Sequence, residues 1–164
     1  MIMVYLIVAI LVVVADQAVK ILVRSTMVQG DSVSVIGDFF RITYINNRGA
    51  ALGMFASNNK MLLAVPVVII ISIMLFVFLH RYTHPMVKYA LTLVAAGGFG
   101  NLIDRTLFGQ VTDMFSFRIF PPIFNVADIA VTVGCILILI YALFGERMDH
   151  RAAGAGKGRP KHGR

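Results

Sequence analysis

The chain has 164 residues, of which 59% are hydrophobic and only 14% are charged, and its formal net charge is +7. Soluble domains contain about 25% charged residues, so this chain has too few polar side chains to cover a water-soluble core of its length. The composition excludes an ordinary soluble domain and predicts a protein that folds within a lipid bilayer.

Four hydrophobic segments are long enough to cross a membrane, at about residues 4–23, 61–79, 86–103 and 125–144. The first lacks a basic start and an A-x-A cleavage site, so we expect a retained helix rather than a cleaved signal peptide. The second is 19 residues without a charge, which at about 1.5 Å per residue matches the thickness of the hydrocarbon core. Glycines interrupt the third, although small residues let membrane helices approach closely. We expect residues 1–146 to form one integral membrane domain.

Two longer segments separate these spans. Residues 24–60 alternate polar and apolar side chains at 32–36 and 39–45, which predicts a small extramembrane β-sheet. Residues 106–123 contain two consecutive prolines and several apolar side chains. We expect this second stretch to be a short interfacial segment at the membrane surface.

The positive charge is concentrated at the C-terminal end. After Gly145 the basic residues are Arg147, Arg151, Lys157, Arg159, Lys161 and Arg164. Beside a hydrophobic segment such a cluster is typical of a cytoplasmic flank that contacts anionic membrane lipids. We expect residues 147–164 to be a basic, disordered cytoplasmic tail. The chain carries no base-stacking platform or known nucleic-acid module, so the sequence argues against a nucleic-acid partner.

The loop charges also predict an orientation. The short link of residues 80–88 contains Arg81 and Lys88, and it should share the cytoplasmic side with the basic tail. An even number of spans then places the N-terminus there too. Four basic residues in the 24–60 segment run against this rule. The prediction is a multi-pass protein with both termini cytoplasmic and with residues 24–60 and 106–123 facing outward.

Several charged residues lie within or beside the spans, where each costs at least about 2.5 kcal/mol and therefore requires a partner or a function. Asp16 and Lys20 are four apart, with the acid first, so one helix face should carry them as an ion pair. This pair either braces the helix against its neighbours or contacts a substrate. Arg105, beside Asn101 and Asp104 at the end of the third span, either anchors the helix to lipid headgroups or holds a ligand carbonyl or phosphate.

Asp113 and Asp128 are fifteen positions apart in the sequence, with a loop between them. If the loop folds back on the fourth span, the two carboxyl groups meet at the outer interface and share one proton. Such a pair can activate a water molecule as a base and polarise an amide carbonyl as an acid. The alternative is two separate acids that face the interface.

Other chemistries lack their residues. His80 and His84 have a possible metal-ligand spacing, but no Cys, Asp or Glu is nearby, so the sequence predicts no metal site. Two other classes remain open on these observations. The charged residues could form the relay of a small proton-coupled transporter or channel, or the outer loops could belong to a membrane adaptor without catalytic activity.

Five short motifs follow one another between Asp16 and Asp128. They are D-Q-x-x-K from Asp16, N-R-G-A-A from Asn47, G-N-L-I-D-R from Gly100, V-T-D ending at Asp113 and F-N-V-A-D ending at Asp128. In this order, and with four spans, the chain resembles the bacterial lipoprotein signal peptidases, also called signal peptidase II.

The resemblance implies an aspartic endopeptidase of the bacterial cytoplasmic (inner) membrane. Its substrates would be prolipoproteins, cut just before a diacylglyceryl-modified cysteine at the outer face, with no metal or organic cofactor. Globomycin, a cyclic peptide, would bind as a substrate mimic. Asp113 and Asp128 match the catalytic aspartates of the family. The positions matching substrate-site residues are Asn47, Asn101, Arg105 and Asn125, and those matching structural or supporting residues are Asp16, Lys20, Gly49 and Asp104.

The resemblance also implies a fold. It is a mainly α membrane protein with four transmembrane helices, cytoplasmic termini and a small extracytoplasmic sheet that cradles the substrate. A mobile segment beside the sheet would lie near residues 47–59. Residues 51–54 read A-L-G-M where A-A-F-S is more usual in the family, so the side chain that closes over the site stays open.

Overall fold

The computed structural model describes residues 2–49, 59–80 and 83–157, with side chains described as far as Gly145. Within these residues the chain forms four long helices, α1 (Ile2–Thr26), α2 (Asn59–Leu79), α3 (Pro85–Phe108) and α4 (Val126–Lys157). Each contains a stretch long and apolar enough to cross a membrane. The four predicted spans are therefore confirmed.

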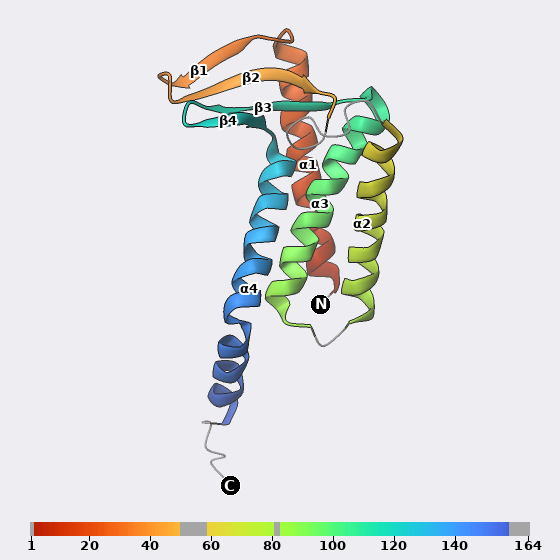
Figure 1. The fold of residues 1–164 in the computed structure, drawn as a ribbon, viewed down its shortest axis with the longest axis vertical. Helices are drawn as coiled ribbons and strands as arrows, with labels where there is room; N and C mark the ends of the chain where they lie inside the picture. The colour runs from red at the N-terminus through yellow and green to blue at the C-terminus, as the bar shows by residue number, and fades with distance from the viewer. Residues whose placement is uncertain (1, 50–58, 81–82, 158–164) are drawn as a thin grey trace.

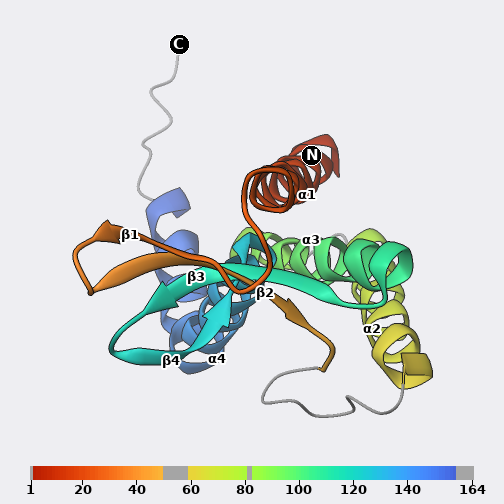
Figure 2. The same cartoon turned by 90° about the horizontal axis from the view of Figure 1, so that it is seen from above.

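The helices run side by side, with a small sheet at one end and the start of α1 at the other (Figure 1). Helix α3 packs against each of the other three helices. The view from above shows the sheet extending to one side, over the end of α4 (Figure 2). The bundle thus presents one end, covered by the sheet, on which side chains from several elements can meet.

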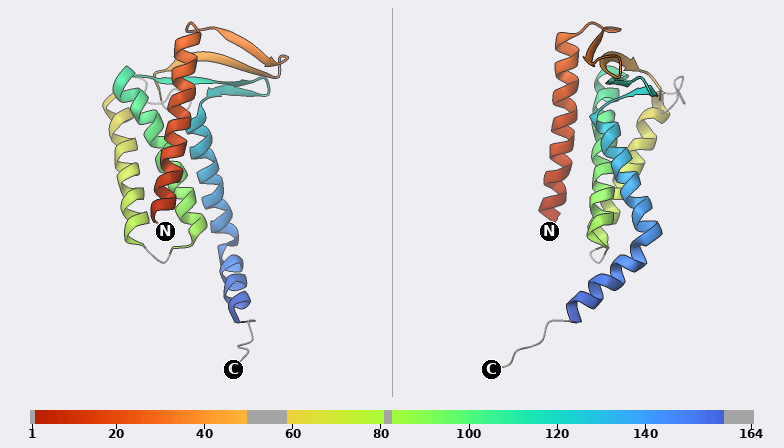
Figure 3. Two further views of the ribbon diagram at one scale, coloured as in Figure 1. Left: turned by 180° about the vertical axis from the view of Figure 1, so that it is seen from behind. Right: turned by 90° about the vertical axis from the view of Figure 1, so that its left-hand side faces the viewer.

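Two helices are longer than the sequence predicted. Helix α3 continues past residue 103 to Phe108, where Gly109 adopts a left-handed conformation with φ of 70° and caps the helix. Helix α4 continues past residue 144 to Lys157 and bends away from the bundle (Figure 3). The disorder expected for residues 147–164 and the single-domain boundary at residue 146 stay predictions. The segment at residues 51–54 lies outside the described residues.

The sheet has four antiparallel strands in the order β1-β2-β3-β4. The strands β1 (Ser32–Ile36) and β2 (Phe40–Asn47) confirm the sheet predicted within residues 24–60. The expected interfacial segment also contributes two strands, β3 (Val111–Phe117) and β4 (Phe120–Phe124). The sequence did not indicate β4 because Pro121 and Pro122 interrupt its strand pattern, nor β3, which pairs with β2 far away in the sequence. Proline is tolerated in β4 because it is an edge strand.

Helices α3 and α4 touch through glycines. A Cβ atom at Gly97 would lie 2.3 Å from the carbonyl oxygen of Ala127, and one at Gly134 would lie 2.6 Å from that of Ala90. Lipid tails are as apolar as leucine, so membrane helices associate by close packing of small residues rather than by the hydrophobic effect. Gly97, one of the glycines that weakened the third predicted span, therefore lets α4 approach α3, together with Gly134 of α4.

Candidate active site

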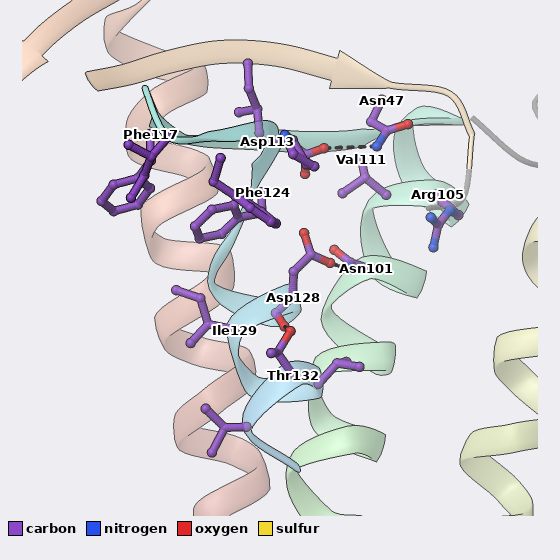
Figure 4. Close-up of a pocket in the computed structure, with 16 residues that line it drawn as sticks. Asn47, Asn101, Arg105, Val111, Asp113, Phe117, Phe124, Asp128, Ile129 and Thr132 are labelled. Atoms are coloured by element: carbon purple, nitrogen blue, oxygen red, sulfur yellow. Dashed lines mark hydrogen bonds between the residues drawn. The ribbon is translucent and has the colours of Figure 1, made fainter. Parts of the chain in front are cut away.

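The two candidate catalytic acids come from different elements. Asp113 is the third residue of β3, and Asp128 lies in the first turn of α4. The two carboxyl groups point toward one another across the same space (Figure 4). The meeting of the two carboxyl groups that the sequence left conditional is therefore present.

A local motif orients Asp128. Asn125 precedes α4, and its side-chain oxygen accepts a hydrogen bond of 2.9 Å from the backbone N–H of Asp128. In return, the Asp128 carboxylate accepts one of 3.1 Å from the backbone N–H of Asn125. This reciprocal pair is a capping box, which satisfies two free donors at the start of a helix. It holds the Asp128 side chain at the helix end, facing the sheet.

Each carboxyl oxygen of the pair accepts one amide hydrogen bond. Asp113 accepts from the side chains of Asn47, at 3.0 Å, and Asn125, at 2.7 Å. The other oxygen of Asp128 accepts from Asn101 at 2.8 Å. Asn47 reaches Asp113 because β2 pairs with β3, which sets Asn47 opposite Val111, two residues before Asp113. Three predicted substrate-site residues thus hold the two acids.

The environment of Asp113 disfavours its charged form. Burial raises the pKa of Asp113 from its usual 3.8 to about 6, with a contribution in the same direction from the negative charge of Asp128. The hydrogen bonds from Asn47 and Asn125 lower it in part. A carboxyl group with such a pKa can exchange a proton near neutral pH, as a general acid or base must.

The pair opens into a cavity of about 650 Å³. Most of its polar side chains, those of the two acids, Asn47, Asn101 and Arg105, lie toward the sheet (Figure 4). Apolar side chains of β4 and α4, such as Phe120, Phe124, Ile129 and Val133, also line it and form its apolar wall. Stacked rings of Phe40 and Phe117, 4.7 Å apart, support the sheet beside this wall. The cavity suits an extended apolar chain with one polar bond at its end.

Arg105 also lines the cavity. It is half-buried, and its Nη2 atom donates a hydrogen bond of 3.2 Å to the carbonyl oxygen of Gly49. The Gly49 N–H in turn donates to Asn47 at 2.9 Å. Of the two roles left open for Arg105, its place in the cavity favours contact with a ligand over contact with headgroups.

The predicted ion pair of Asp16 and Lys20 is confirmed, with 2.9 Å between the charged atoms and both side chains buried. Asp104 joins it at 3.4 Å from the Lys20 ammonium. All three lie behind the cavity rather than in its lining.

Sequence reasoning gave no role to two neighbours of this group. Gln17 donates to Asp104 at 3.2 Å, and Arg24 forms an ion pair with Asp104 at 3.4 Å. The sequence could have indicated Arg24, because it follows Lys20 by four residues and so lies on the same helix face. Within the part of the chain that the structure describes, no group of three or more His, Cys, Asp or Glu side chains is placed to hold a metal ion.

Comparisons with known proteins agree on one family. Residues 8–144 match the family model described as signal peptidase (SPase) II. A lipoprotein signal peptidase of Halothermothrix orenii is 39% identical over 146 residues, which cover 89% of this chain and 99% of that protein. The corresponding protein of Staphylococcus aureus is 37% identical over 141 residues, 84% of this chain and 86% of that one.

Two solved structures are similar to this fold. One is a bacterial membrane enzyme solved by the in meso method at 2.3 Å, with a TM-score of 0.80 and 34% identity, covering 98% of this chain and 94% of that chain. The other, solved at 1.9 Å, has a TM-score of 0.77 and 37% identity, covering 85% and 92% of the two chains.

Proposed function

The chain belongs to the signal peptidase II family, and from this premise we propose that it is an aspartic endopeptidase with Asp113 and Asp128 as its catalytic pair. Membership makes it a multi-pass membrane peptidase that removes signal peptides from lipoproteins. The proposal adds the catalytic type, the residues and the bond cut, which lies just before a diacylglyceryl-modified cysteine. The observation that carries it is the pair of facing carboxyl groups, held by amide donors at the end of an apolar cavity.

The proposed reaction needs only these two groups and water. The ionised member of the pair takes a proton from a water molecule, which attacks the carbonyl carbon of the residue before the cysteine. The protonated member donates a hydrogen bond to the carbonyl oxygen and later a proton to the leaving amine. The shared proton belongs to the pair, since strongly interacting acids titrate together.

The remaining cavity residues have proposed binding roles. Asn47, Asn101 and Asn125 hold the acids and line or support the site, while the five donors of Arg105 suit the peptide carbonyls of a bound substrate. The apolar wall along α4 would hold the signal-peptide side chains, with the two acyl chains remaining in the lipid. We propose the same cavity as the binding site of globomycin.

A cleavage assay on two forms of one substrate tests the function. The purified protein in detergent is given one prolipoprotein with and without its diacylglyceryl group, and products are identified by mass spectrometry. We expect cleavage of the lipidated form only, with a product that begins at the modified cysteine. Equal cleavage of both forms would contradict the proposed substrate, and cleavage at another bond would contradict the proposed site.

The orientation is also a proposal, based on Arg81 and Lys88 at the link between α2 and α3 and on the basic residues after Gly145. Two single-cysteine variants test it, each made in a Cys135→Ala background. Ser34→Cys places a thiol on the exposed strand β1, and Thr83→Cys places one between α2 and α3. A membrane-impermeant maleimide should label Ser34→Cys, but not Thr83→Cys, in spheroplasts. Detergent should allow labelling of both variants. The reverse pattern in spheroplasts would place the sheet and active site in the cytoplasm.

The pKa of Asp113 predicts the pH dependence of cleavage. Because this pKa is about 6, the free enzyme loses the shared proton as the pH rises through that value, and kcat/KM should fall above it. The Asn47 hydrogen bond lowers this pKa, so Asn47→Leu should move the alkaline limit to higher pH. Asn46→Leu is the control, because Asn46 bonds to Gln29 on the surface. An unmoved limit in Asn47→Leu would contradict the assignment of this limit to Asp113.

A further inference from the structure

A buried charged group lies behind the proposed catalytic pair. The Lys20 ammonium is fully buried between the carboxylates of Asp16, at 2.9 Å, and Asp104, at 3.4 Å. These three residues are called the ion cluster below. A buried ion cluster is weak evidence for stability, because desolvation offsets much of the attraction between the charges. Its contacts with the proposed pair indicate a more specific role, which rests on the function proposed above.

The two acids of the ion cluster hold the backbone beside each catalytic residue. Asp16 accepts a hydrogen bond of 2.9 Å from the N–H of Ala127, which directly precedes Asp128. Asp104 accepts one of 3.0 Å from the N–H of Thr112, which directly precedes Asp113. Since Lys20 contacts both acids, it connects the backbone positions of the two catalytic residues, which lie on different elements.

Lys20 also acts through the side chain of Asn101. Its Nζ atom donates a hydrogen bond of 2.9 Å to the side-chain oxygen of Asn101. With this oxygen engaged by a group that can only donate, the amide nitrogen of Asn101 is turned toward Asp128, to which it donates at 2.8 Å. The same oxygen accepts from Asn125, which also donates to Asp113. Lys20 thus fixes the amide of Asn101, which orients Asp128 directly and reaches Asp113 through Asn125.

From these contacts we infer that Lys20 is a positioning residue for the catalytic pair, setting the distance and orientation of Asp113 and Asp128 through Asn101 and through the two acids of the ion cluster. A lysine that only braced α1 against α3 could do so through Asp104 or Asn101, both on α3. Such a lysine would not be expected to change the pH at which the catalytic pair exchanges its proton.

Lys20 also acts on the pair by its charge. Its positive charge lowers the pKa of Asp113, in opposition to burial, which is the largest influence on that pKa. The acids that interact with Lys20 are Asp16 of α1, Asp104 of α3, Asp113 of β3 and Asp128 of α4. The other cations that act on these acids are Arg24 of α1, which pairs with Asp104, and Arg105 of α3, which interacts with Asp104, Asp113 and Asp128. Removing Lys20 leaves the carboxylates in excess, so the pair should release its shared proton at higher pH.

The test is the pH profile of prolipoprotein cleavage by Lys20→Met. We expect kcat to fall at least about tenfold, because misplaced acids lose the geometry of the transition state, while KM stays near the wild-type value. Both limits of the pH profile should move up by about half a unit or more. Lys88→Met is the matched control. It removes another buried lysine of the bundle, about 20 Å along α3 from Asn101 at 1.5 Å per residue, and should leave both limits unchanged.

A lower rate with an unmoved pH profile would overturn the inference, because a merely structural lysine affects only the amount of folded enzyme. Lys20→Met leaves the buried Asp16 without its cation, while Asp104 keeps its ion pair with Arg24. The variant Asp16→Asn/Lys20→Met therefore provides a second measurement. It removes one charge of each sign and keeps an amide oxygen to accept from Ala127. We expect its kcat to stay at least about tenfold below wild type, because Asn101 still lacks its donor. A wild-type kcat would overturn the inference.

Asp113→Asn, assayed in parallel, separates this inference from the proposed function. If Asp113→Asn still cleaves, the catalytic pair itself is wrong and the inference falls with it. If Asp113→Asn is inactive while Lys20→Met retains the wild-type rate and pH limits, the proposed function stands and only the role of Lys20 is wrong.

Discussion

Asp113→Asn and Asp128→Asn are each expected to lower kcat for prolipoprotein cleavage by at least about 1000-fold. Asparagine has the shape of aspartate but can neither remove a proton from water nor donate one to the leaving amine. Each variant should still bind the lipidated substrate, because the apolar wall and Arg105 are unchanged. Single-turnover cleavage together with binding of the substrate measures both expectations.

Asp38→Asn is the matched control for this pair of variants. Asp38 is 79% exposed and forms only a surface ion pair of 3.6 Å with Arg41, so the same substitution there should leave kcat unchanged. Thermal unfolding of all three variants checks that they fold. Cleavage by Asp113→Asn or Asp128→Asn within about tenfold of wild type would show that the carboxyl groups are structural, since the loss would be below that of a general acid or base.

The parts of this fold that the sequence predicted depend on local patterns. Uninterrupted apolar segments indicated the four helices, and alternation within residues 24–60 indicated β1 and β2. Strand β4 was missed because it is short and contains Pro121 and Pro122, and β3 was missed because it forms by pairing with β2, which is distant in sequence. Pairing of this kind has no signal within the segment itself.

The candidate site likewise contains some contacts that sequence spacing predicts and others that it does not. Spacing alone could place Asp16 and Lys20 on one helix face, and it could only suggest that Asp113 and Asp128 meet. Two other contacts involve backbone groups: Asp104 accepts from the N–H of Thr112, and Asp16 accepts from the N–H of Ala127. Every residue has a backbone N–H, so no residue type in the sequence marks such a contact. The five motifs pointed to the site through resemblance to a family rather than through spacing.

Gly97→Ala is expected to destabilise the protein and reduce cleavage together. The added methyl group would lie 2.3 Å from the carbonyl oxygen of Ala127 and 2.8 Å from a methyl of Val131, so α4 must move away from α3. Overpacking of this kind costs about 1–3 kcal/mol. Because Ala127 directly precedes Asp128, the shift also displaces a catalytic carboxyl, and a displacement near 1 Å can cost about 100-fold in rate.

The adjacent Gly98 provides the matched control, because a Cβ atom there meets only the Ile70 side chain, at an ordinary 3.5 Å. Gly98→Ala should keep the wild-type cleavage rate and unfold at the same or a higher temperature, since alanine favours a helix interior over glycine by about 1 kcal/mol. Thermal unfolding and kcat of the two variants are compared in the same detergent. Equal behaviour of the two would mean that close contact between α3 and α4 does not set the position of Asp128. A stable Gly97→Ala with a reduced kcat would instead show that this contact serves the site more than the fold.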